Sequence, residues 1–345
     1  MIGLPSKPSN PNSHPTSTPR WFAVKSAPTS PERVASIDIG TNTILLLIAE
    51  VCQGKLNTVL DRETIVRLGE GVHKTGVLSE GAMQRGFQAL KGYLKQCREI
   101  GVEKIFAVGT SALREAKNSA LFLQRVKENY GLSIDVISGE EEAHLSFLAV
   151  AEDLKDRERV LLVVDVGGGS TELIHGKDND ILQWTSLPLG IVRFSERFLL
   201  SDPVKEAEWK AMAEEIRKQL SRFSFPREPV LMISIGGTGT ALASVELGLE
   251  IFIPEKIHRF VLTREALRNQ LSLYLSKTVE ERKTIKGLPS ARADVILAGG
   301  TILYLIMEEA DCSSFMISSH GVRYGLIYKE VYMPGNSKIQ IPNSK

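Results

Sequence analysis

The sequence predicts an α/β protein made of two related halves. In residues 163–174, VVDVGGGSTELI, an apolar strand leads into a glycine-rich turn that has an acid on either side. Residues 35–51, ASIDIGTNTILLLIAEV, have the same design. Each segment places a carboxylate at the end of a strand and then residues whose amides and hydroxyls can donate to an anion. The repetition indicates a degenerate internal duplication, in which two facing turns would form a phosphate clamp.

Length and composition describe an ordinary globular protein with two domains. The chain has 345 residues, of which 43% are hydrophobic and 24% are charged. This length exceeds a usual single core. The net charge of +1 provides no overall field that would steer a polyanion. We therefore expect no nucleic-acid partner, and any phosphate binding must be local.

Cysteine usage and hydropathy indicate a cytoplasmic protein. The three cysteines are far apart and lack the spacing of a zinc site, which favours the reduced state. The longest apolar run, residues 44–51, is interrupted by Glu50 and is too short to cross a bilayer. We expect no membrane segment. The apolar C-terminal helices are compatible with a homodimer.

Three segments are predicted along the chain. Residues 1–33 are rich in Pro and Ser and predict a disordered extension, with a targeting role as the alternative left open. Residues 34–139 form the first predicted domain and residues 140–321 the second. A C-terminal helix at about 322–335 is expected to join the first domain.

Strands and helices alternate through the folded part. The first half predicts a strand meander and then a helix that begins at Ser79, its N-cap, and ends before Gly101. The predicted meander strands are 34–39, 44–51 and 58–66, and the second half begins with a strand at 160–164.

Paired glycines follow two later apolar runs. Residues 231–245, LMISIGGTGTALASV, and 294–308, DVILAGGTILYLIME, are each predicted to be strand, glycine pair and helix. Glycine at such a turn lets the backbone approach a ligand closely. Four glycine turns after four strands indicate a ligand cleft at the carboxyl ends of the strands.

The two glycine turns are the first candidate binding elements. Asp38, Thr41 and Asn42 could anchor a metal and donate to phosphate, or they could form a plain hairpin turn with an Asx-type hydrogen bond. Three consecutive glycines from Gly167 favour a ligand loop over a tight hairpin. No Lys follows them, so this is not a Walker phosphate loop.

Two charged candidates have equally ordinary structural explanations. Ser138 and Glu141 fit a capping box at the start of a helix, so only the position of Glu141 between the two halves suggests a catalytic base. Arg114 could bind phosphate or could be a surface arginine at a helix start. The histidines, among them His258 and His320, show no common spacing, and no metal or catalytic role is assigned to them.

Seven ordered motifs resemble the exopolyphosphatase and guanosine pentaphosphate phosphohydrolase (Ppx/GppA) family. They are IDIGTNTILLLIAE, RLGEGV, GTSALREAKN, VISGEEEAHLSF, DVGGGSTEL, SLPLGIVRFSERF and SIGGTGTALA, and they span about residues 34–330. In one departure, SSHGVRYGLIYKE has His320 and Tyr324 where the family motif has Arg and Glu.

The resemblance implies a two-domain actin-like ATPase fold (ASKHA, ribonuclease H-like), with a cleft between the duplicated halves. By this likeness Glu141 is the general base, Arg114 neutralises charge, and Asp165, Glu172 and Asp38 hold Mg²⁺. The residues implied in ligand binding are Asp38, Gly40, Thr41, Asn42, Gly167, Gly168, Gly169, Ser170, Gly236 and Gly237.

The leading hypothesis is a magnesium-dependent phosphohydrolase that releases orthophosphate from inorganic polyphosphate, from guanosine pentaphosphate, or from both. That activity would connect the protein to phosphate metabolism and the stringent response. One alternative is a kinase of the same fold, with residues 235–244 as its purine site. The other is a non-catalytic sensor of guanosine tetraphosphate or polyphosphate.

Overall fold

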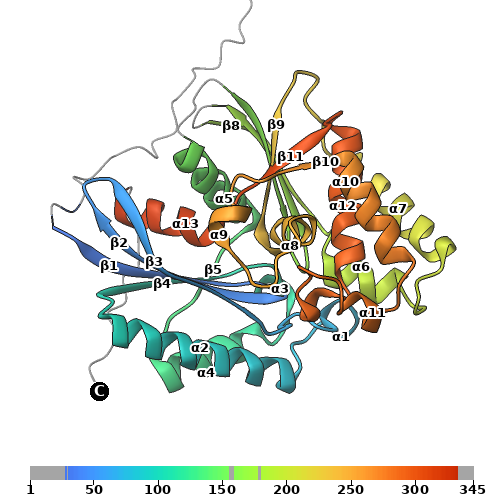
Figure 1. The fold of residues 1–345 in the computed structure, drawn as a ribbon. Helices are drawn as coiled ribbons and strands as arrows, with labels where there is room; N and C mark the ends of the chain where they lie inside the picture. The colour runs from blue at the N-terminus through green and yellow to red at the C-terminus, as the bar shows by residue number, and fades with distance from the viewer. Residues whose placement is uncertain (1–27, 29, 155–158, 178–179, 333–345) are drawn as a thin grey trace, which may run out of the picture.

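The structure is a computed structural model that describes residues 28, 30–154, 159–177 and 180–332 (Figure 1). Most of the predicted extension at 1–33 lies outside these residues, as does the end of the C-terminal helix predicted to reach about 335. The described chain forms two mixed β-sheets with helices packed around them. Among the described residues, no helix combines the length and apolar character needed to cross a bilayer.

The first sheet has the strand order β3-β2-β1-β4-β5. β1, β2 and β3 form an antiparallel meander, while β4 and β5 run parallel to β1. The short turns enforce the antiparallel pairs, and the long helical connection to β4 permits the parallel one. The strands are Glu32–Ile39, Thr43–Cys52, Lys55–Ile65, Lys104–Gly109 and Asp135–Val136, numbered β1 to β5.

The second sheet repeats this plan in the order β10-β11-β9-β6-β7-β8. β6, β7 and β8 are the antiparallel meander, and β9 and β11 extend the sheet in parallel from β6. The shared strand order confirms the predicted duplication. The strands are Val160–Val166, Thr171–Lys177, Asp180–Leu187, Leu231–Ile235, Val261–Thr263 and Ser314–Ile317, numbered β6 to β11.

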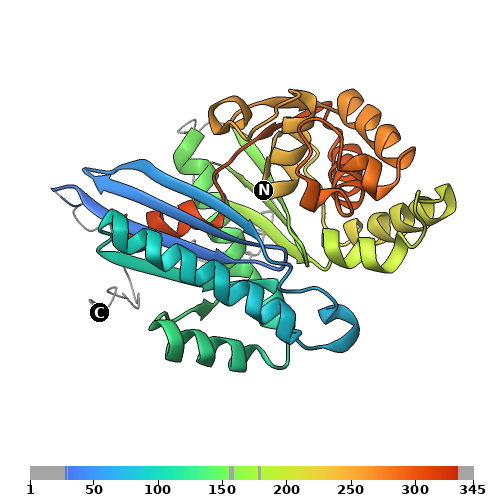
Figure 2. The same ribbon diagram turned by 60° about the horizontal axis from the view of Figure 1, so that its bottom comes forward.

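Helices α2 (Glu80–Ile100) and α4 (Ser119–Tyr130) cover one face of the first sheet (Figure 2). The predicted start of α2 is confirmed, because Ser79 Oγ accepts a hydrogen bond from Ala82 N at 3.2 Å. Its predicted end is also confirmed, since Gly101 has a φ of 74°. Only glycine adopts this left-handed backbone without strain.

Helix α5 (Gly139–Leu154) lies between the two sheets (Figure 1). One side of α5, with Leu145 and Ala149, packs with α13 (Val322–Ile327) onto the first sheet. Another side, with Ala143 and Phe147, packs onto the second sheet. A helix buried on two sides holds its polar residues in positions set by both halves of the protein.

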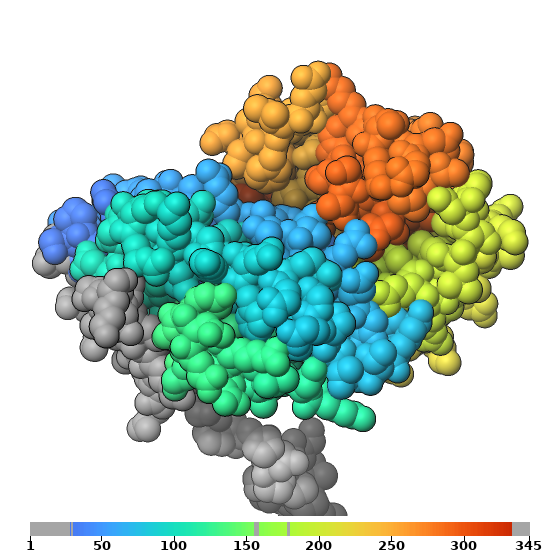
Figure 3. All heavy atoms as spheres, turned by 90° about the horizontal axis from the view of Figure 1, so that it is seen from below, coloured from blue at the N-terminus to red at the C-terminus, as the bar shows by residue number. Residues whose placement is uncertain are grey.

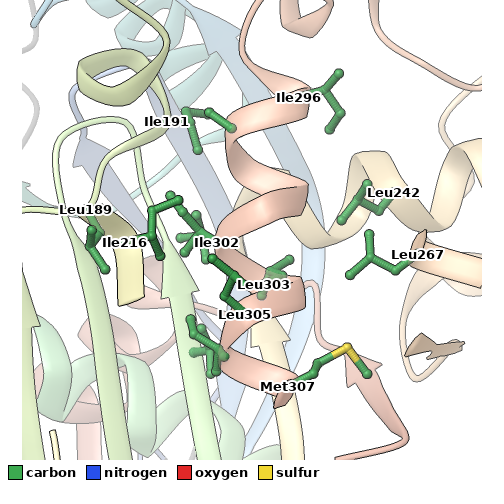
Figure 4. Close-up of a cluster of buried hydrophobic side chains, with 14 of the residues drawn as sticks. Leu189, Ile191, Ile216, Leu242, Leu267, Ile296, Ile302, Leu303, Leu305 and Met307 are labelled. Carbon is green, nitrogen blue, oxygen red and sulfur yellow. The ribbon is translucent and has the colours of Figure 1, made fainter. Parts of the chain in front are cut away.

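The largest core surrounds α12 (Ile296–Glu309), which is apolar on nearly every side (Figure 4). Figure 4 shows Ile191, Ile216, Leu242 and Leu267 pointing toward this helix from neighbouring elements. The other helices are α1 Val72–Thr75, α3 Ser111–Glu115, α6 Ile191–Phe198, α7 Glu206–Leu220, α8 Gly236–Glu246, α9 Pro254–Ile257, α10 Arg264–Leu275 and α11 Val279–Arg282.

The strand predicted at the start of residues 294–308 is wrong. This segment is helical from Ile296, so Gly299 and Gly300 lie inside α12 and form no turn. Their role is close packing: a Cβ on Gly299 would lie 2.6 Å from Thr238 Cγ2, and one on Gly300 would lie 2.9 Å from Leu271 Cδ2. A short apolar run cannot by itself distinguish a buried strand from a buried helix.

The architecture is the two-domain actin-like ATPase fold that the family resemblance implied. Figure 3 shows the light-blue part of the first half in contact with the orange part of the second along a seam. The predicted domain boundary at 139/140 falls at the first turn of α5, the helix that both sheets share.

The core around α12 predicts a large difference between two leucine truncations. Leu303 is fully buried and Leu200 is 75% exposed. We expect Leu303→Ala to lower the free energy of unfolding by about 2–5 kcal/mol, because it leaves a cavity. Leu200→Ala should change it by less than about 0.5 kcal/mol. Urea denaturation followed by circular dichroism measures both, and equal midpoints for the two variants would contradict the described core.

Candidate active site

A cleft lies at the seam, where β1 and β4 of the first half end opposite β6 and β9 of the second. It encloses about 690 Å³, part of it open to solvent. The glycine turns after β1 and β6 both line it, as do the first turn of α5 and the start of α13. The duplicated halves thus present equivalent loops to one cavity.

The first loop, Gly40 to Asn42, is held by main-chain hydrogen bonds. Gly69 N donates to Thr41 O at 2.9 Å, and Val66 N donates to Asn42 O at 2.9 Å. The side chains of Thr41 and Asn42 are buried, yet Thr41 Oγ1 and both polar atoms of the Asn42 amide have no hydrogen-bond partner. Buried polar atoms are normally paired, so these atoms are suited to hydrogen bonds with a ligand.

The second loop, Gly167 to Ser170, contacts the first directly. Gly167 N donates to Ser170 O at 2.9 Å, which closes the turn. A Cβ on Gly168 would lie 2.9 Å from Thr41 Cβ and 3.0 Å from Asn42 N. Any side chain at this position would therefore push the loops apart, which explains the glycine. The structure brings the two predicted loops together.

Three predicted acids meet beside these loops. Asp38 and Glu172 are buried, and Asp165 is partly exposed toward the cleft. Burial, with help from the nearby charges of Glu142 and Asp165, raises the pKa of Asp38 to about 8. Burial and Glu142 raise the pKa of Asp165 to about 7, and burial raises the pKa of Glu172 well above its usual value.

This group of acids fits a hard divalent cation. Asp38 Oδ1 is buried and has no hydrogen-bond partner, while Ser186 Oγ donates to Glu172 Oε1 at 2.7 Å. Mg²⁺ prefers carboxylate oxygens and water as ligands. Burial, and then repulsion from the neighbouring acids, disfavours the charged form of these carboxyls, which a bound cation would offset. Asp38, Asp165 and Glu172 are the residues that would hold Mg²⁺.

The structure directs Glu142 into the cleft, whereas Glu141, the residue predicted as the base, faces away from it. Glu142 lines the cavity and is 7% exposed. Glu141 points elsewhere, with its Oε1 2.5 Å from Lys329 Nζ. Consecutive residues of a helix are about 100° apart around its axis, so only one of the two can face the cleft. The predicted cap is present, since Ser138 Oγ accepts from Glu141 N at 3.1 Å.

Arg114 lies behind Glu142 and is not among the residues that line the cleft. Its Nη1 donates to Glu142 Oε2 at 2.6 Å and to Ile137 O at 3.1 Å. Burial raises the pKa of Glu142, and Arg114 partly offsets this rise. In this arrangement Arg114 orients the acid through one oxygen.

Two arginines that the sequence analysis did not select line the cleft, Arg323 and Arg292. Arg323 is held by Asp61, with Nε–Oδ1 and Nη2–Oδ2 distances of 3.0 and 2.7 Å. Arg292 pairs with Glu63, across the seam. An arginine inside the otherwise apolar run 322–327 was a signal for such a role, since buried arginine is rare without a partner.

The sequence alone did not distinguish Glu142 from Glu141. Residues 142, 145, 146 and 149 recur at helical spacing and are all buried in α5, but residues 141, 145 and 148 also recur at helical spacing. Only the packing of α5 shows which of these faces is buried.

Gly236 and Gly237 lie at the cleft where α8 begins. Gly236 has a φ of +80°, and a Cβ there would lie 2.7 Å from Asp165 Oδ1. Gly237 contacts the guanidinium of Arg292 so closely that a side chain would not fit. Both glycines therefore make room for charged groups of the site.

An acid-lined cleft between paired glycine loops, on a duplicated α/β fold, defines a phosphate-handling protein of the actin-like ATPase class. Residues 47–333 match the model of the Ppx/GppA phosphatase family. The chain belongs to this family.

Solved structures agree with this assignment. The chain is 39% identical to the Ppx/GppA family member of Aquifex aeolicus, with a TM-score of 0.75 and coverage of 88% of this chain and 98% of that one. For an exopolyphosphatase from Cytophaga hutchinsonii the identity is 27% and the TM-score 0.80, with coverage of 87% and 98%.

A longer curated relative is also similar. The chain is 34% identical over 317 residues to a bifunctional 3-dehydroquinate synthase/phosphatase of Fusobacterium nucleatum subsp. nucleatum. The match covers 86% of this chain and 46% of the relative, so the chain spans about half the length of that protein.

The buried acids predict that metal-free protein loses stability as the pH rises. The folded-state pKa of Asp38 is about 8, above its usual 3.8, so the folded protein binds more protons than the unfolded chain between these values. The contribution of Asp38 to the free energy of unfolding is fully present below pH 3.8 and is lost as the pH rises through about 8. Melting temperatures in chelator should fall over this range, and less steeply for Asp38→Asn.

Asp135→Asn is the matched control, because Asp135 is exposed. Its melting temperatures should follow those of the unmodified protein at every pH. An unchanged slope in Asp38→Asn would mean that this carboxyl does not carry the raised pKa.

Proposed function

We propose that the protein is a magnesium-dependent phosphohydrolase that releases orthophosphate from the end of inorganic polyphosphate, from guanosine pentaphosphate, or from both. The observation that carries this proposal is the Glu142 carboxyl, which lines the cleft together with the two glycine loops. The similar structure from Cytophaga hutchinsonii is described as an exopolyphosphatase, which supports polyphosphate as a substrate.

Glu142 is the general base in this proposal. Burial raises the pKa of Glu142 above its usual value, which makes the carboxylate a stronger base than an exposed glutamate. It accepts a proton from water as the water oxygen bonds to the terminal phosphorus. The bond from phosphorus to the bridging oxygen breaks, and the shortened chain or nucleotide leaves with the electron pair.

The two loops hold the terminal phosphoryl group. Thr41 and Asn42 provide buried polar atoms without partners, and Gly168 and Gly169 pack directly against this loop. Fixed donors of this kind stabilise charge that builds up on phosphoryl oxygens. Mg²⁺ held by Asp38, Asp165 and Glu172 would neutralise the same oxygens. Arg323 supplies positive charge within the cleft.

The kinase alternative has less support from the site. Its purine would have to bind near the start of α8, but the Arg292 guanidinium covers Gly237 there and pairs with Glu63 of the first half. The sensor alternative uses the same loops and predicts binding without turnover.

Phosphate release separates the three hypotheses. Purified protein is incubated with short polyphosphate, long polyphosphate or guanosine pentaphosphate, with Mg²⁺ or with chelator. We expect orthophosphate to be released from at least one substrate, without any acceptor and only in the presence of Mg²⁺. Saturable binding without release favours the sensor, and ADP formed from ATP only with an acceptor favours the kinase.

Adjacent glutamates in α5 give a matched pair of variants. Glu142→Gln keeps the size of the side chain but removes the base, so phosphate release should fall by about 10²–10⁴-fold. Glu141→Gln removes only a partly exposed ion pair with Lys329 and should leave the rate within about 3-fold. Comparable losses in the two variants would refute the assignment of Glu142.

A further inference from the structure

A second group of polar side chains lies outside the phosphate cleft. It consists of Asp153 at the end of α5, His258 after α9 and His320 before α13. His258 Nε2 lies 3.2 Å from Asp153 Oδ2, and His320 Nδ1 lies 3.7 Å from Asp153 Oδ1. One ligand atom from each of the three residues falls within 4.8 Å of the others. Segments far apart in the sequence thus bring three potential metal ligands together.

We propose that Asp153, His258 and His320 form a binding site for a divalent transition-metal ion such as Zn²⁺, separate from the phosphate cleft. Two imidazoles and one carboxylate are a donor set that suits Zn²⁺ and its neighbours and is unusual for Mg²⁺. None of the three residues lines the cleft. The proposal is therefore independent of the proposed hydrolase activity.

The surroundings restrict how the two rings can turn. The His258 ring stacks on His320 with centroids 4.5 Å apart, and the His320 ring stacks on Tyr324 at 3.8 Å. His258 Nδ1 lies 3.3 Å from Ser319 Oγ. Ser319 N also donates to this Nδ1 at 3.3 Å. A metal on Nε2 would place the proton on Nδ1, so this bond would be exchanged for one from Nδ1 to the Ser319 hydroxyl.

One atom in the group, His320 Nδ1, is available to a ligand. His320 Nδ1 is buried and has no hydrogen-bond partner, although it faces Asp153. Burial lowers the pKa of His320 to about 4, so the ring is neutral at pH 7, which is the form that binds metals. Ligand atoms around tetrahedral Zn²⁺ are about 3.4 Å apart, so closing on the ion requires movements of about 1 Å.

The guanidinium of Arg259 already interacts with the Asp153 carboxylate and would compete with a metal ion for it. Arg259 Nη2 lies 3.3 Å from Asp153 Oδ1 and 2.9 Å from Asp153 O. Its side chain is 52% exposed, so it can move into solvent when an ion binds. The Oδ2 atom of Asp153 faces His258 instead. The alternative explanation of the group is a hydrogen-bonded network that needs no ion.

Such an ion would join three parts of the fold. α5 carries Glu142 in its first turn and Asp153 in its last, and Gly321 beside His320 lines the cleft. Metal binding at the far end of α5 would therefore hold this helix against the loops before β10 and α13. We expect Zn²⁺ to raise the melting temperature of the protein.

The test uses the full chain, without a polyhistidine tag, after removal of metals by chelator and dialysis. Zn²⁺ alone is titrated calorimetrically, and melting temperatures are recorded with and without it. We expect one equivalent to bind and to stabilise the protein. His258→Gln and Asp153→Asn, which keep hydrogen-bonding groups of similar size, should bind at least about 100-fold more weakly.

His144→Ala is the matched control, since His144 is exposed on the same helix and lies outside the group. It should bind Zn²⁺ like the unmodified protein. No saturable binding, or equal binding in all variants, would overturn the proposal and leave a hydrogen-bonded network or adventitious surface binding. If one variant fails to fold in the metal-free melt, His320→Gln replaces it in the same comparison.

Discussion

Confinement of four carboxyl groups in one cleft is the constraint on which the site depends. Asp38, Glu142, Asp165 and Glu172 all line the same cavity, and each has a raised pKa. Burying carboxylates without matching positive charge costs free energy. A bound cation would offset this cost, and a ligand that hydrogen-bonds to the loops would satisfy their unpaired polar atoms. The cleft is therefore suited to charged ligands, and the cost of burying its carboxylates is greatest when no ligand is bound.

Helix α5 connects the chemistry of the cleft to the rest of the molecule. Its two buried sides pack on different sheets, so its rotation is determined by both halves together. That rotation directs Glu142 to the cleft and leaves Glu141 to Lys329. The same helix ends at Asp153, where the proposed metal site would restrain it. Changes at either sheet can therefore reach the Glu142 carboxylate through a single element.

Charged pairs also connect the two halves of the protein. Arg67 bonds both oxygens of Asp294, with distances of 2.7 and 2.9 Å. In a second pair the arginine comes from the second half and the acid from the first, with Arg193 2.5 Å from Glu115. These pairs are partly exposed, so each adds modest stability.

The sequence alone determined most of the element order, the duplication and the two glycine loops of the cleft, because glycine turns and strand periodicity are local properties. It did not decide which way a helix faces. Glu141 was preferred over Glu142, and α12 was assigned a strand, since rotation and burial depend on both sheets packing together. Asp153, His258 and His320 were likewise invisible as a group. Only tertiary structure brings such distant residues together, because their proximity comes from packing of the whole chain.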